Sequence, residues 1–306
     1  MKKIVLCAVV LGLSVAVAGC AGIRKASDAG KYEQKATLGD EAAVKTLIDA
    51  LRSDDKAVRD AAYNSITTVG SPAVPQLIAA LDDPDPAIRE YAAGALGNIG
   101  DERAIAPLLK VLDSGGGRRY AAAWALGEMK AVPAIDRLIK ALGEKNEALQ
   151  KESTRALIKL GETAVPALIV ALESENTDTR KYAARALGVI QDNRAEEPLI
   201  KALKDPDNEV TAAAALSLGS CGKQKSVKPL MDALYSPDLV TKVNASIALG
   251  QLNAKDSVDE LTKLMDTDAD PYMREWCARA LENITGNRYK YKDEKGAMVY
   301  PYNLYR

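Results

Sequence analysis

The chain reads DPDPAIREYAAGALGNIG over residues 83–100. Asp85 is suited to cap a helix start, and Pro86 is tolerated in a first turn, where its missing N–H costs nothing. At 100° per residue, Ile88, Ala92 and Leu96 fall on one apolar arc. Gly100 then stands where a helix ends in a left-handed residue. The stretch predicts a helix over 87–99 that must bury one face against a neighbour.

The same pattern recurs along most of the chain. The ends of the corresponding helices return every 30 to 32 residues, at Gly70, Gly100, Lys130, Gly161, Gln191, Gly222, Asn253 and Thr285. A shorter apolar helix precedes each one, with a proline in its first turn in several copies. Fixed self-similarity at this period indicates stacked two-helix units that share one continuous core. We therefore predict an all-α solenoid, a superhelix of about eight two-helix repeats over 38–285.

Two helix columns that stay mostly small, those of Ala93 and Gly97, are predicted to support the stacking. The column of Gly97 stays small in Gly127, Gly188, Gly219 and Gly250, which allows neighbouring helices to approach closely. Beside it, Lys181 is expected to face solvent. Cys221 and Cys277 fall two units apart, roughly 20 Å, which is too far for a disulfide, so we expect free thiols in the core.

The repeats resemble HEAT repeats, specifically the bacterial HEAT-like repeats named after phycobilisome lyases. The resemblance rests on runs such as VPAL at 165–168, DPDPAIR at 83–89 and AARALG at 183–188. It implies that the second helix of each unit lines the inner side of the superhelix. It also implies that a basic column, represented by Arg89, pairs with acids in the inter-helix turn of the neighbouring unit. Gln150 and Thr211 interrupt that column.

The N-terminus is typical of an exported protein. Lys2 and Lys3 precede an apolar run over 4–17 that is too short to span a bilayer but fits a signal peptide. The run ends in VAGC at 17–20, which resembles the lipobox of bacterial lipoproteins. The resemblance implies a signal peptide over 1–19, lipid attachment at Cys20 and a tether over 20–37. Ala21 after the cysteine favours the outer membrane, with the protein facing the periplasm.

A stripe of large side chains is the candidate binding surface. Three positions per second helix lie outside both the apolar arc and the small column, and they hold residue types that are enriched in interface hot spots. The candidate partner-binding residues are Tyr91, Trp124, Arg155, Tyr182, Arg185, Trp276 and Arg279. The alternative is that these large residues pack against an adjacent helix.

Three other segments depart from the repeat. Ser114–Arg119, with three glycines, replaces the usual Asp-Pro turn; a flexible turn is the default interpretation and an anion site the alternative. Asp266–Asp270 resembles the start of a calcium loop but lacks the later Gly and Glu, which favours a helix-capping turn. The tyrosine-rich tail over 286–306 is either a cap on the last repeat or a partner-binding arm.

Composition excludes several functions. The chain has 306 residues, 41 basic and 42 acidic, and no histidine. The charge balance argues against nucleic-acid binding, and the missing histidine removes His-dependent catalysis and His-ligated metals. No nucleophile has a base beside it, so we expect no catalytic residue, cofactor, metal or small-molecule substrate. We predict a non-enzymatic envelope lipoprotein that acts as a scaffold for protein partners. An enzyme of the bilin lyase type and a purely structural component are the alternatives.

Overall fold

The computed structural model describes residues 22–115 and 119–301. The signal peptide, the lipobox and Cys20 lie outside the described residues, as do Gly116, Gly117 and Arg118. The chain divides into two compact units, the first ending at Leu77 and the second beginning at Ile78.

The described chain is helical apart from one short hairpin, which confirms the all-α solenoid. Eight helix pairs follow one another, as the period predicts. They are α2 (Glu41–Ala50) with α3 (Lys56–Val69), α4 (Val74–Ala80) with α5 (Pro86–Ile99), α6 (Ile105–Asp113) with α7 (Arg119–Glu128), α8 (Ile135–Leu142) with α9 (Glu147–Leu160), α10 (Val165–Ala171) with α11 (Thr177–Ile190), α12 (Glu196–Ala202) with α13 (Asn208–Cys221), α14 (Gln224–Ala233) with α15 (Leu239–Gln251), and α16 (Val258–Thr267) with α17 (Pro271–Thr285).

The first unit contains a helix that the sequence analysis missed. Residues expected to form a tether instead form α1 (Ala29–Thr37), which packs against α2 and α3. Ala29 and Ala36 are buried, as is Ile23 before the helix. The segment is polar apart from its alanines, so its sequence resembles a linker, but these small residues are enough to dock it.

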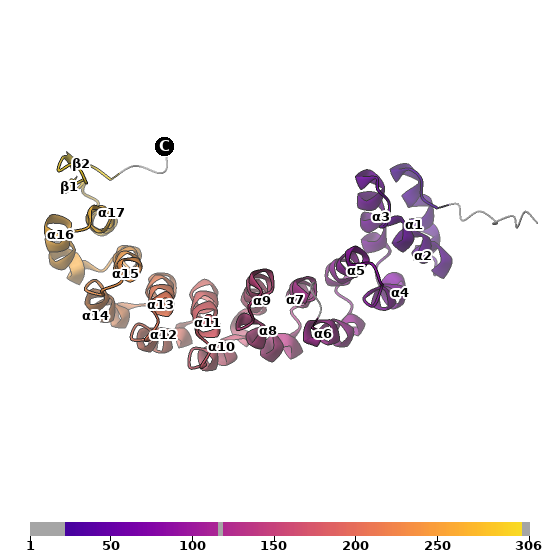
Figure 1. Ribbon diagram of the computed structural model, residues 1–306, viewed down its shortest axis with the longest axis horizontal. Helices are drawn as coiled ribbons and strands as arrows, with labels where there is room; N and C mark the ends of the chain where they lie inside the picture. The colour runs from indigo at the N-terminus through magenta and orange to yellow at the C-terminus, as the bar shows by residue number, and fades with distance from the viewer. Residues whose placement is uncertain (1–21, 116–118, 302–306) are drawn as a thin grey trace, which may run out of the picture. The chain divides into compact units, whose positions relative to one another are not determined.

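In the second unit, the second helices of successive pairs lie side by side in one row and the shorter first helices form another (Figure 1). Local chemistry sets the helix ends. Asp or Asn side chains accept hydrogen bonds from first-turn N–H groups of six helices in the second unit, from caps at Asp85, Asn146, Asn176, Asp207, Asp238 and Asp270. Lys130, Gln191 and Asn253 end helices at positive φ although they are not glycine. Gly222 differs, with an extended backbone at φ −73°.

The small column brings neighbouring second helices into contact, as predicted. A Cβ added at Gly127 would stand 2.6 Å from the Ala156 Cα, and one at Gly219 would stand 2.8 Å from the Ala248 Cα. These distances leave no room for a side chain. The glycines therefore set the spacing of the row, and alanines from the next helix fill the remaining space.

The basic column pairs with the next unit at three places, which confirms the ladder there. Arg119 donates to both oxygens of Glu144 at 2.5 and 2.8 Å, and Arg180 donates to both oxygens of Asp205 at 2.7 and 2.9 Å. Lys242 lies 2.5 Å from Asp268. Gln150 instead donates to the Leu142 carbonyl within its own unit.

The tail folds back onto the last pair. Strands β1 (Tyr291–Lys292) and β2 (Met298–Val299) form an antiparallel hairpin that contacts α16 and α17 through β1. Arg274, the last member of the basic column, donates to the carbonyls of Lys292 at 2.7 Å and Asp293 at 3.4 Å. Backbone oxygens of the tail thus occupy the place that acidic side chains take elsewhere in the ladder.

None of the described helices is both long and apolar enough to cross a bilayer.

Replacing Gly188 by alanine tests the close approach. Alanine is the better helix former, by about 1 kcal/mol. Its Cβ, however, would stand 2.4 Å from the Ser217 Oγ and 2.8 Å from the Ser217 Cα. We expect Gly188→Ala to lower the free energy of unfolding by about 1–3 kcal/mol through overpacking, measured by urea denaturation. The control is Val189→Ala, one residue on and 60% exposed, which should cost less than about 0.5 kcal/mol. A Gly188→Ala protein as stable as the wild type would contradict this account.

Candidate functional site

The seven predicted binding residues, which we call the second-helix stripe, lie on five helices of the second unit. They are Tyr91 on α5, Trp124 on α7, Arg155 on α9, Tyr182 and Arg185 on α11, and Trp276 and Arg279 on α17. Arg155 and Arg185 are exposed and the other five are half-buried. The structure brings Tyr182 together with Arg185 on α11, and Trp276 together with Arg279 on α17. The stripe therefore divides into clusters of side chains that lie on different helices.

The first cluster spans α7 and α9. The ammonium group of Lys159 lies 5.9 Å from the centre of the Trp124 ring and also pairs with Glu128. Arg155 pairs with Glu152, whose other oxygen, Oε2, is buried without a hydrogen-bond donor among the described residues. An aromatic face, two cations and an unsatisfied carboxylate oxygen therefore lie on two neighbouring helices.

Trp124 also has a structural role. An added Cβ at Gly97 on α5 would stand 2.9 Å from the Trp124 Cζ3, so the indole lies directly against the preceding second helix. The alternative of packing against an adjacent helix therefore holds for part of this ring.

The second cluster lies on α11. Two cations lie near the Tyr182 ring: the Lys181 ammonium is 4.9 Å from the ring centre and the Arg185 guanidinium is 5.5 Å from it. The expectation that Lys181 faces solvent is wrong. It is only 9% exposed and pairs with Asp178 at 2.6 Å and Glu209 at 2.8 Å. Burial disfavours its charge, but the hydrogen bonds to both carboxylates outweigh that effect, and the pKa of Lys181 is raised.

The third cluster lies on α17. Trp276 makes an edge-to-face contact with Tyr272 at 6.1 Å and has the Arg279 guanidinium 5.2 Å from its centre. Arg279 is held by Glu275 at 2.6 Å. The indole N–H of Trp276 is buried and has no acceptor among the described residues. Burial, and then the negative charge of Glu275, raise the pKa of Tyr291 beside this cluster.

Between α11 and α17 the row is more apolar. Val189 is 60% exposed and Leu216 on α13 is 44% exposed. The sequence analysis did not single out Lys159, Lys181 or these two aliphatic residues as site residues. Lys159, Val189 and Leu216 stand in the same three columns as the stripe, whereas Lys181 stands in a neighbouring column and pairs with Glu209 on the next second helix.

The two cysteines of the repeat array are free and buried, as predicted. Burial raises the pKa of the Cys221 thiol to about 11 and that of the Cys277 thiol to about 12. Both remain protonated at neutral pH and are shielded from solvent, so neither is suited to act as a nucleophile.

The acidic turn over 266–270 caps a helix and forms an ion pair between repeats. Asp270 accepts a hydrogen bond from the Tyr272 N–H at 2.8 Å, and Asp268 pairs with Lys242. Across the described ranges, no group of His, Cys, Asp and Glu side chains is arranged to hold a metal ion.

The arrangement therefore provides binding chemistry. Aromatic faces with cations stacked on them, next to exposed aliphatic side chains, suit a flat conjugated ligand that carries negative charge.

Comparison with known proteins identifies the repeat. The pattern of the HEAT repeats family matches residues 44–127, 165–243 and 227–292. The PBS lyase HEAT-like repeat matches residues 118–144, which include Trp124. Over 54 residues the chain is 43% identical to the bilin biosynthesis protein RpcF of Synechococcus sp. (strain WH8020). That stretch is 18% of this chain and 26% of RpcF, so the chain spans about a quarter of the length of this relative.

Two solved structures are similar. The complex of CpcE and CpcF of phycocyanin lyase from Nostoc sp. PCC7120 is 27% identical, with 49% of this chain and 98% of that chain covered and a TM-score of 0.47. Importin beta is 15% identical, with 82% of this chain and 42% of that chain covered and a TM-score of 0.57, which supports the solenoid fold alone.

The comparisons contradict the expectation of a non-enzymatic scaffold and of no enzymatic function. The matching stretch of RpcF and the PBS lyase repeat favour the alternative of a bilin lyase type. The absence of histidine and of a nucleophile beside a base argued against an enzyme in the sequence analysis. That argument assumed that the reacting groups belong to this chain, and the assumption fails if another molecule supplies them.

Two substitutions test which residues of the stripe contribute to packing. We expect Trp124→Ala to lower the free energy of unfolding by about 1–3 kcal/mol, because it empties the space against Gly97. Arg155→Ala, at a side chain 67% exposed, should cost less than about 0.5 kcal/mol. Urea denaturation followed by circular dichroism measures both. Equal costs would mean that Trp124 does not pack as described.

Proposed function

The chain belongs to the HEAT-repeat family, and we propose that it has a lyase-type function on a bilin, carried out together with a protein partner. The observation that carries the proposal is the stretch that is 43% identical to RpcF, a bilin biosynthesis protein. The PBS lyase repeat at 118–144, which contains Trp124 of the stripe, supports it.

The chemistry of the second-helix stripe suits this ligand class. A bilin is a linear tetrapyrrole, a flat conjugated chain that bears carboxylate groups. Tyr182 and Trp276 offer ring faces, and Arg185 and Arg279 stand beside them as cations. A guanidinium forms stronger hydrogen bonds to a carboxylate than neutral donors do, so the exposed Arg185 would fix a carboxylate while the rings hold the conjugated chain. Arg279 is already paired with Glu275 and would orient Trp276.

The acceptor of the bilin would belong to the partner. A lyase adds a group to a double bond or removes one from it, and the added group must come from a nucleophile. Cys221 and Cys277 are buried thiols with raised pKa values, about 11 and 12, and do not serve as one. In this proposal the chain binds and orients both molecules, and its contribution to the rate comes from positioning.

Biliverdin titration tests the binding step. Both tryptophans of the chain lie in the stripe, so tryptophan fluorescence reports on it directly. We expect biliverdin to quench this fluorescence in the wild type, and Arg185→Glu to weaken binding about tenfold or more because it replaces a cation by an anion next to Tyr182. Arg194→Glu makes the same charge change outside the stripe, at a side chain 51% exposed, and should bind like the wild type.

Covalent attachment tests the reaction itself. Deleting the gene in its own organism should remove a zinc-fluorescent, bilin-bearing protein band from denaturing gels. The wild-type gene should restore the band and the Arg185→Glu gene should not. A band unaffected by the deletion would refute the lyase-type function.

We also propose that the protein is lipid-anchored at Cys20 in the bacterial envelope, on the outer membrane facing the periplasm. The signal-like segment over 1–19 supports this location.

Cys20→Ala removes the proposed attachment atom, so the variant should move from the detergent phase to the aqueous phase of a Triton X-114 partition. Cys7→Ala, within the signal segment, should partition like the wild type. If Cys20→Ala stays in the detergent phase, the lipid anchor is refuted.

A further inference from the structure

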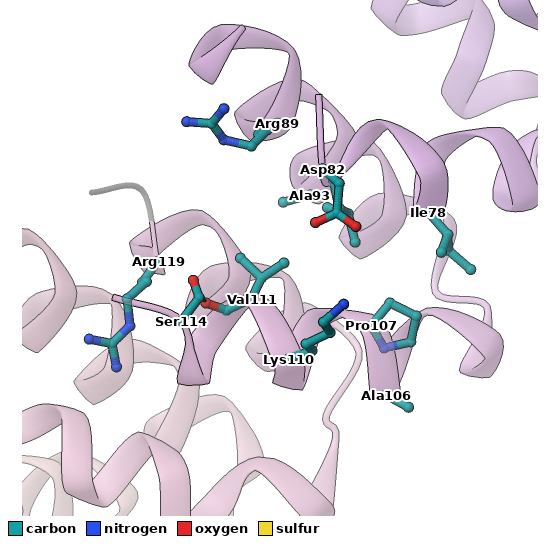
Figure 2. A pocket seen from close by; sticks show the side chains of 11 residues that line it. Ile78, Asp82, Arg89, Ala93, Ala106, Pro107, Lys110, Val111, Ser114 and Arg119 are labelled. Atoms are coloured by element: carbon teal, nitrogen blue, oxygen red, sulfur yellow. Dashed lines mark hydrogen bonds between the residues drawn. The ribbon is translucent and has the colours of Figure 1, made fainter. Parts of the chain in front are cut away.

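Two pockets of the second unit occupy equivalent places in different repeats. The first has a volume of about 580 Å³ and is lined by side chains of α4 to α7 (Figure 2). The second has a volume of about 850 Å³ and lies at α10 to α12. Their lining residues correspond 91 positions apart, in the pairs Ile78 and Ile169, Leu81 and Leu172, Asp82 and Glu173, Arg89 and Arg180, Pro107 and Pro198, Lys110 and Lys201, and Ser114 and Asp205.

The arginine of the second pocket, Arg180, donates hydrogen bonds from all three nitrogens of its guanidinium. Its Nη1 donates to the carbonyls of Ser174 and Glu175 at 2.8 and 3.1 Å. Its Nε and Nη2 donate to the two carboxylate oxygens of Asp205. Both side chains of this bidentate pair are largely buried: 12% of the Arg180 side chain and 8% of the Asp205 side chain are exposed.

The arginine of the first pocket lacks the corresponding acid. Arg89 makes the same two bonds from Nη1, to the carbonyls of Asp83 and Pro84 at 2.6 and 3.1 Å. At the place of Asp205 the chain has Ser114, a neutral side chain. The Nε and Nη2 donors of the half-buried Arg89 guanidinium therefore have no carboxylate acceptor among the described residues.

The equivalent lysines of the two pockets, Lys110 and Lys201, also differ in whether a carboxylate pairs with them. In the second pocket Lys201 pairs with Glu173 at 2.6 Å. In the first pocket the shorter Asp82 replaces that glutamate, and within the described ranges Lys110 forms no ion pair. The third cation of the first pocket, Arg119, is already bound to Glu144. Among the described residues, the first pocket therefore keeps two cations without a carboxylate partner, Arg89 and Lys110, whereas the equivalent Arg180 and Lys201 of the second pocket are both paired.

The remaining lining is apolar. Ile78, Leu81 and Val111 lie around the first pocket together with Pro107. A volume of several hundred Å³ with an apolar wall and a few converging polar groups is typical of a small-molecule site. The wall suits a hydrocarbon body, and the fork of Arg89 suits a carboxylate.

We propose that this pocket, the Arg89 pocket, binds a small organic acid. Its carboxylate takes the place that Asp205 takes beside Arg180 and accepts from the Nε and Nη2 of Arg89, with Lys110 nearby. Its carbon skeleton lies against Ile78, Leu81 and Val111. None of these residues belongs to the second-helix stripe, so the site stands independently of the proposed bilin function.

The experiment replaces the missing acid. Binding of 4-phenylbutyrate to the full chain is measured by ligand-observed saturation-transfer NMR, with 4-phenylbutan-1-ol as the uncharged analogue. Ser114→Asp supplies an internal carboxylate, and Ser114→Asn supplies the same shape without charge. We expect the wild type and Ser114→Asn to bind the acid, and Ser114→Asp to bind it at least tenfold more weakly. The alcohol should bind at least tenfold more weakly than the acid in the wild type and in Ser114→Asn.

A second readout comes from the same pair of variants. Ser114 is exposed, so neither variant should disturb the fold, and Ser114→Asp should melt above Ser114→Asn because it closes the pair with Arg89. Equal binding of the acid by Ser114→Asp and Ser114→Asn, equal binding of acid and alcohol, or no binding by the wild type at millimolar probe would each overturn the proposal. Displacement of the acid by equimolar inorganic phosphate would also overturn it, since any oxyanion would then suffice.

Discussion

The close approach of neighbouring second helices is the constraint on which the rest of the structure depends. At Gly127 and Gly188 an added Cβ would lie within 2.8 Å of a backbone Cα of the next helix. Helices at this spacing exclude bulky side chains from their contact, so the core of the row is built from alanine and leucine. Most large side chains then stand on the remaining faces, where tyrosine and arginine gather in the second-helix stripe, and Trp124 is an exception that reaches the contact at Gly97.

Charge satisfaction between repeats adds a second constraint. A guanidinium at the start of a second helix can hold two turn carbonyls with one nitrogen and a carboxylate of the next repeat with the other two, as Arg180 does. At the end of the array, the tail carbonyls of Lys292 and Asp293 take over for Arg274. Where neither an acid nor a tail carbonyl of the described residues stands at such a position, the remaining guanidinium donors are open to a ligand or to solvent. Ser114 creates this situation at Arg89.

The features that repeat could be predicted from the sequence, and those that occur once could not. The helix pairs, the small column, the buried cysteines and the ladder each follow from a period that many copies reinforce. Helix α1 has no second copy in the pattern, and its docking rests on a few alanines. Lys181 looked exposed because its partner Glu209 lies on the next helix and belongs to a different column. The packing of Trp124 against Gly97 likewise crosses repeats, and helix periodicity within one repeat does not report it.

The sequence analysis placed the bilin lyase type second for a related reason. A search for catalysis within one chain looks for a nucleophile, a base and a group that orients them. This chain has no histidine, and its described thiols are buried and protonated. A protein that holds a reactive ligand against a partner needs neither group, because the double bond belongs to the ligand and the nucleophile to the partner. What it needs is a rigid row of helices that fixes aromatic and cationic side chains at a constant spacing. The close approach of neighbouring second helices supplies that rigidity.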